Sequence, residues 1–113
     1  HADRLRLVGA ELRQLPGGNG GVALDALLAL LGELQVNDVL VEAGPTLSGA
    51  LIAAGLVDEL ITYVAPRLLG DAAHGSVSLA PARLDDTPWL TITDIRRVGE
   101  DIRITAEPRA AQP

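Results

Sequence analysis

The sequence predicts an α/β domain, in which helices and strands alternate along a single chain. Three observations support this class: apolar residues at helical spacing after position 24, a continuous apolar run at Val39–Val41, and a second helical pattern after Gly44-Pro45. A short apolar run between two helices is typical of a strand that is covered on both faces. We therefore expect a mostly parallel sheet flanked by helices, in a chain whose 113 residues fit one domain.

The first third of the chain contains two expected helices with a loop between them. Residues 2–8 suit the end of a helix that Gly9 would stop. The glycine-rich run Pro16–Gly21 is a strong loop signal. Asp25 lies near the start of the next helix, where the helix dipole favours an acid. The apolar stripe of this helix consists of Leu24, Leu27, Leu28, Leu31 and Leu34.

A third helix is expected over Thr46–Ala54, with Gly55 in the left-handed position after its end. Leu56 would then contact Leu51, as in a Schellman ending. The residues expected to face the sheet are Leu47, Leu51 and Ala54. A strand should follow at about Leu60–Ala65.

The C-terminal part predicts a loop and then an antiparallel β-hairpin. Residues 69–88 are rich in glycine, proline and small residues, which favours a loop. The hairpin strands are expected at Trp89–Arg97 and Ile102–Glu107. Along the second strand, one face should carry Ile102, Ile104 and Ala106. We expect the domain to occupy residues 1–107 and residues 108–113 to form a flexible tail.

Composition excludes several classes of function. A net charge of −6 and only two aromatic residues, Tyr63 and Trp89, argue against a partner nucleic acid. The longest apolar-rich run, Val22–Leu34, contains acidic residues and is too short to span a membrane. The absence of cysteine excludes disulfides and fits a cytoplasmic location. No signal peptide is visible, and the start at His1 within a helical pattern leads us to expect a piece of a longer protein.

The segment from Val41 to Gly49 combines features of a ligand site. A strand is expected to end in Glu42, and a helix begins within four residues. In open α/β sheets, ligands gather beyond the carboxyl ends of strands, where helix amides lack partners. Gly44 permits close approach of a ligand, and the Thr46 hydroxyl can cap the helix or bind a phosphate. Gly49 indicates close packing on one face of the helix.

The pattern alone leaves a simpler interpretation open. Gly-Pro-Thr is also an ordinary strand-to-helix turn, Gly49 can simply pack on a strand, and Glu42 can be a solvated carboxylate. The spacing matches neither the GxGxxG of a dinucleotide-binding fold nor a P-loop. His74 stands alone in a loop, so no metal site is expected.

Three segments, in order and with the right gaps, resemble one known family. Val41–Leu51, Ala54–Leu60 and Ala65–Gly70 are similar to the reductase domain of the bifunctional riboflavin-biosynthesis deaminase/reductase. The departures are mild: Ala43 stands where many members have glycine, and Arg67 where lysine is common. The resemblance extends from about Leu5 to Glu107 and covers the C-terminal part of that domain.

The resemblance implies a dihydrofolate-reductase-like fold and NADPH-dependent reduction of 5-amino-6-(5-phosphoribosylamino)uracil, a pyrimidine ribosyl phosphate, to its ribityl form. It also implies a homodimer. By this resemblance Glu42 contacts the substrate, whereas no catalytic proton donor is assigned. The implied NADPH-binding residues are Gly44, Pro45, Thr46, Leu47, Ser48, Gly49 and Ala50.

The same resemblance limits what this chain is expected to do alone. Zinc belongs to the family's deaminase domain, and its cysteine-containing motif is not in the sequence. The first half of the reductase domain is also missing, so we expect little or no activity from the isolated chain. NADPH-dependent turnover by the purified 113 residues would refute this expectation. Two alternatives remain open: a reductase of the same fold with another pterin-like or pyrimidine substrate, and a non-catalytic dimerisation module.

Overall fold

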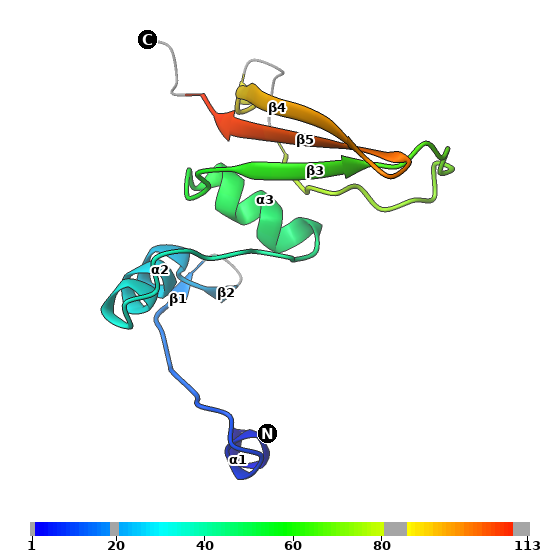
Figure 1. Ribbon diagram of the computed structural model, residues 1–113. Helices are drawn as coiled ribbons and strands as arrows, with labels where there is room; N and C mark the ends of the chain where they lie inside the picture. The colour runs from blue at the N-terminus through cyan, green and yellow to red at the C-terminus, as the bar shows by residue number, and fades with distance from the viewer. Residues whose placement is uncertain (1, 19–20, 81–85, 110–113) are drawn as a thin grey trace. The chain divides into compact units, whose positions relative to one another are not determined.

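The computed structural model describes residues 2–18, 21–80 and 86–109 (Figure 1). The chain consists of two compact units, His1–Leu40 and Val41–Pro113.

The first unit begins with helix α1 (Ala2–Leu7), which ends at Gly9 as expected. Gly9 has a φ of 85°, and its N–H donates to the Arg6 carbonyl over 3.0 Å. The Ala10 N–H donates to the Leu5 carbonyl over 3.1 Å. Together these two bonds form a Schellman motif, which satisfies carbonyls that the helix itself leaves free.

A two-residue antiparallel ladder precedes helix α2 (Leu24–Glu33). Its strands, β1 (Gly17–Gly18) and β2 (Gly21–Val22), lie in the glycine-rich run where only a loop was expected. The predicted apolar stripe of α2 is confirmed in part: its first four leucines are half-buried, whereas Leu34 is the C-cap residue and is 52% exposed. It ends in a Schellman motif at Gln35, which takes a φ of 60° and donates to the Gly32 carbonyl.

The strand predicted at Val39–Val41 is absent, and this prediction was wrong. The segment has no regular secondary structure, and Leu40 is 80% exposed. A strand exists only when its N–H and C=O groups pair with a neighbour. Among the described residues, every strand of the larger sheet pairs with another member of that sheet and none with residues 39–41. The apolar run therefore has strand propensity but no partner strand here.

The second unit begins with helix α3 (Pro45–Ala53), drawn green in Figure 1. Its C-terminal Schellman motif is as predicted: Gly55 has a φ of 67°, and the Leu56 N–H donates to the Leu51 carbonyl over 3.0 Å. The expected packing face was partly wrong. Leu51 is 7% exposed, whereas Leu47 is 42% exposed and Ala54 is also exposed.

Both figures draw α3 beside β3 (Leu60–Val64), the strand that follows it. This strand belongs to a three-stranded sheet of order β3-β5-β4, with β4 at Leu90–Val98 and β5 at Asp101–Pro108. Both pairings are antiparallel. The predicted mostly parallel sheet is therefore not found in the described residues. The three strands themselves lie close to their predicted positions.

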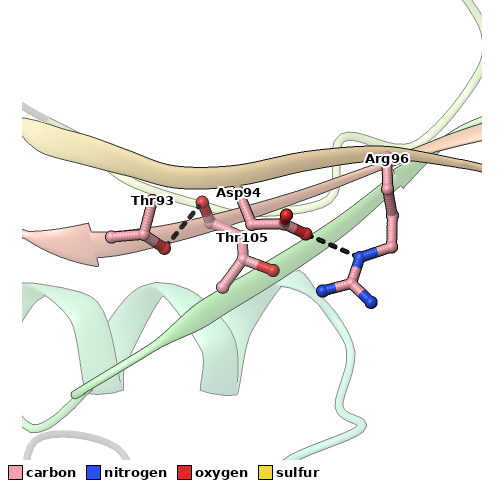
Figure 2. A network of polar contacts seen from close by, with 4 residues as sticks. All are labelled: Thr93, Asp94, Arg96 and Thr105. Carbon is pink, nitrogen blue, oxygen red and sulfur yellow. Dashed lines mark hydrogen bonds and ion pairs between the residues drawn. The ribbon is translucent and has the colours of Figure 1, made fainter.

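The predicted hairpin of β4 and β5 is confirmed, with Val98 opposite Asp101. Gly99 at the first loop position has a φ of 62°, as a type II′ turn requires. The pairing of β4 shifts between Ile92 and Asp94, so that Thr93 forms a bulge. Figure 2 shows the Thr93 hydroxyl donating to the Thr105 carbonyl over 3.3 Å.

Beside the bulge, the Arg96 Nε donates to the Asp94 carboxylate over 2.7 Å (Figure 2). Thr105, which faces this side of the sheet, is 5% exposed, and its own hydroxyl has no hydrogen-bond partner. Side chains therefore stabilise the bulge, although the central strand retains one unsatisfied hydroxyl.

The tail expected at residues 108–113 begins inside the sheet. Pro108 is the last residue of β5, and the Arg109 N–H donates to the Trp89 carbonyl over 2.7 Å. The rest of the expected tail, residues 110–113, lies outside the described residues.

The apolar core of the described residues is thin. Leu51 and Ala106, at 7% and 4% exposed, are its buried hydrophobic residues. In the register of β4 and β5, Ile92 pairs with Ala106 and Ile95 pairs with Ile104. These four side chains lie on one face of the sheet. Ile92 is 56% and Ile95 61% exposed, so this apolar face is uncovered at its β4 edge.

Candidate functional site

Glu42 lies three residues before Pro45, the first residue of α3, in a segment without regular structure. It was expected at the end of a strand, but that strand is missing. Its position next to the helix start does not depend on the strand, because Glu42 and Gly44 are separated only by Ala43. The Glu42 side chain is exposed and can therefore accept hydrogen bonds from a ligand.

The start of α3 carries no side-chain cap. Gly44 is the N-cap, with extended backbone angles of φ −70° and ψ 171°, and Pro45 is the first helical residue. Thr46 was a candidate for the capping role, but it lies inside the helix and makes no capping bond. The N–H groups of Thr46 and Leu47 have no acceptor within a helix that begins at Pro45. They are available to an anion, which the helix dipole also favours.

Gly44 leaves open space at the helix start. A Cβ built at this position would meet no atom within 4 Å outside its own chain neighbours. Thr46, Leu47 and Ala50 are exposed around the same turns. Ser48 is half-buried, and its hydroxyl donates to the Ala43 carbonyl over 3.4 Å, which ties the helix back to the preceding segment. A ligand can therefore approach the backbone of this turn closely.

Gly49 belongs to a different surface of the helix. It is buried, and its backbone lies against the backbone of Ser78. Close packing at Gly49 was expected, but Ser78 as the partner was not. Nothing in the sequence pairs these positions, because Ser78 lies in the run of small residues before β4.

Among the described residues, no group of three or more His, Cys, Asp or Glu side chains is placed to hold a metal ion. His74 is exposed in the loop that follows β3. None of the helices formed by these residues combines the length and apolar character needed to span a bilayer.

Comparison with known proteins identifies relatives of the chain. A family described as "RibD C-terminal domain" matches residues 2–104. The riboflavin biosynthesis protein RibD of Escherichia coli is 48% identical over 89 residues, which are 78% of this chain and 24% of that protein. A protein of Buchnera aphidicola named 5-amino-6-(5-phosphoribosylamino)uracil reductase is 35% identical over 80% of this chain and 44% of its own length.

A solved structure, Acinetobacter baumannii RibD form 2, superposes with a TM-score of 0.75 at 31% identity. It matches 95% of this chain but 29% of its own chain. The chain thus spans about a quarter of the length of the E. coli relative. Its similarity to A. baumannii RibD includes the fold as well as the sequence.

Proposed function

Since the chain belongs to the RibD C-terminal domain family, we propose that it forms part of an NADPH-dependent reductase of riboflavin biosynthesis. The proposed reaction is reduction of 5-amino-6-(5-phosphoribosylamino)uracil, in which the ribosyl side chain becomes ribityl. The observation that supports it most is the family match over residues 2–104, within which the exposed segment from Glu42 to Leu47 lies. The similarity to the Buchnera reductase supports the substrate class.

We assign NADPH to the first turns of α3. The residues proposed to form this site are Gly44, Pro45, Thr46, Leu47, Ser48, Gly49 and Ala50. The uncapped N–H groups of Thr46 and Leu47 suit phosphate oxygens, and the open space at Gly44 suits close approach of a pyrophosphate. When bound, the nicotinamide supplies the hydride.

In this proposal Glu42 orients the substrate. An ionised carboxylate accepts hydrogen bonds only, so it would bind hydroxyl or amino groups of the pyrimidine ribosyl phosphate. Glu42 lies two residues before the N-cap, so the proposed substrate and cofactor contacts would come from neighbouring residues of one segment. Such alignment of two reactants is a large part of what an enzyme contributes to hydride transfer.

The remaining parts of the proposal follow from family membership. We propose a dihydrofolate-reductase-like fold for the complete domain, to which residues 1–107 contribute, and a cytoplasmic location. We also propose a homodimer. The exposed apolar face at Ile92 and Ile95 supports an interface, because exposed apolar patches often mark contact surfaces. A purely structural dimerisation module is the second candidate function, and the same face favours it.

Replacing Gly44 with alanine tests the cofactor site. The new Cβ meets no protein atom within 4 Å, and a φ of −70° suits alanine, so the fold should not change. It would occupy space that the pyrophosphate needs, and we expect NADPH to bind about tenfold more weakly, a loss of about 1.4 kcal/mol. Titration followed by nicotinamide fluorescence measures the affinity.

The matched control is Gly32→Ala in α2, where a Cβ also meets nothing within 4 Å. It should leave NADPH affinity unchanged. Equal affinities in wild type and Gly44→Ala would remove the cofactor assignment. A chain that self-associates in light scattering but binds no NADPH would favour the dimerisation module.

A further inference from the structure

The backbone of Ser78 lies directly on helix α3, across its first turn. The Ser78 N–H donates to the Pro45 carbonyl over 3.0 Å. A Cβ built on Gly49 would overlap the Ser78 carbonyl oxygen and lie 2.8 Å from its carbonyl carbon and 3.3 Å from its nitrogen. We call residues 77–79 the Ser78 strap. The strap thus touches α3 at its first residue and again four residues later.

The contact explains why the helix contains a glycine at position 49. Apart from proline, glycine is the least favourable residue within a helix, so its presence there calls for a packing reason. At Gly49 the atoms that a Cβ would meet are backbone atoms of the strap, which cannot rotate away as a long side chain can. Gly32, the glycine within α2, has no such neighbour within 4 Å. The requirement for glycine is therefore specific to position 49.

The strap also supplies an interaction that the helix start lacks. The N-cap Gly44 has no side chain, and no side-chain hydrogen bond caps α3. Uncapped helix ends fray, because their first amides have no partner. The bond from Ser78 to Pro45 and the packing of Gly49 against the strap both restrain this turn. The same turn carries the free amides of Thr46 and Leu47.

We infer that Gly49 is a positioning residue for the cofactor site and acts through the Ser78 strap rather than by touching the cofactor. The identity of the ligand rests on the proposed function above, whereas the restraint of the α3 start by the strap does not. Gly49 is buried against protein, while Gly44, Thr46 and Leu47 face open space or are exposed. The strap holds the amides of Thr46 and Leu47 in the arrangement that an anion meets.

The test compares Gly49→Ala with Gly32→Ala in the 113-residue chain by amide NMR and hydrogen exchange. In Gly49→Ala the strap must move, so the Ser78 amide should exchange at least about tenfold faster, and the Thr46 and Leu47 amide signals should shift. NADPH should bind about tenfold more weakly. Gly32→Ala, the same chemical change in another helix, should alter none of these readouts.

A second variant covers the case in which Gly49→Ala does not fold. Ser78→Pro removes the N–H that donates to Pro45 without adding an atom to α3. It should shift the Thr46 and Leu47 signals in the same way and weaken NADPH binding. The inference is overturned if the Ser78 amide stays protected in Gly49→Ala, or if the strap is released while the Thr46 and Leu47 signals remain at their wild-type positions.

The outcomes separate this inference from the proposed function. Gly44→Ala should weaken NADPH binding while the Ser78 amide stays protected. If the wild-type chain binds no NADPH at all, the cofactor assignment fails for this chain, and the Thr46 and Leu47 signals still decide whether the strap positions the turn. If NADPH binds and its affinity is unchanged by release of the strap, the positioning role is refuted and the cofactor site stands.

Discussion

Replacing Leu51 with alanine is expected to lower the free energy of unfolding of the unit formed by residues 41–113 by about 2–4 kcal/mol. Leu51 is 7% exposed and is the one large buried hydrophobic side chain among the described residues; the other buried hydrophobic residue is Ala106. Truncating the Leu51 side chain loses the transfer free energy of the removed atoms and leaves a cavity. A core this thin has few other contacts to compensate, so the loss is a large share of the few kcal/mol that stabilise a small domain.

Hydrogen exchange of the β5 amides measures this effect, because β5 is the central strand and its bonds break only when the unit opens. The matched control is Leu47→Ala, the same change on the same helix at a side chain that is 42% exposed. We expect the control to cost less than about 1 kcal/mol. Equal losses for the two variants would show that Leu47 shares the packing face, as the sequence pattern suggested, and would contradict the burial in the structure.

The contrast between these two leucines illustrates what the sequence can predict. The ends of α1 and α3 were predicted correctly, because a glycine in left-handed conformation and two backbone hydrogen bonds are local features. The packing face of α3 was predicted only in part. Which side of a helix is buried depends on segments far away in the sequence, and the helical spacing of Leu47 and Leu51 carries no information about it.

The strands show the same division. Alternation predicted β4, β5 and the Gly99 turn, since neighbouring strands joined by a short loop specify each other. The run Val39–Val41 has equal strand character but no partner among the described residues, and it forms no strand. Whether neighbouring strands run parallel or antiparallel could likewise not be predicted from the local sequence pattern. It is decided by which strand lies alongside, and β5 lies between β3 and β4.

At the candidate site, the helix start was predicted to within one residue, and of the two roles expected for Thr46 the capping role is not found. Gly44 takes the N-cap position, and Pro45 begins the helix where Thr46 was expected to begin it. A threonine one position into the helix cannot act as its N-cap. The exposed amides at this end were nevertheless foreseeable, because every helix start leaves them free.

Replacing Glu42 with glutamine is expected to lower kcat/KM of the reductase by about 10- to 100-fold. The change keeps the size of the side chain and removes its charge, so hydrogen bonds to an ionised acceptor become bonds to a neutral one. Hydrogen bonds to charged groups contribute about 1.5–3 kcal/mol, against about 1 kcal/mol for neutral pairs. Because the amide also presents two donors to groups that donate themselves, part of the substrate contact turns repulsive.

Since the chain spans about a quarter of its E. coli relative, the assay uses that relative with the matching 89-residue segment exchanged for this sequence. The control is Glu59→Gln, an exposed glutamate just before β3 that also loses one charge and should leave kcat/KM unchanged. If Glu42 only orients the substrate, kcat/KM for the substrate should fall while the KM for NADPH stays constant. A Glu42→Gln enzyme with wild-type kcat/KM would show that this carboxylate is merely solvated, and the substrate contact would have to be sought on other residues.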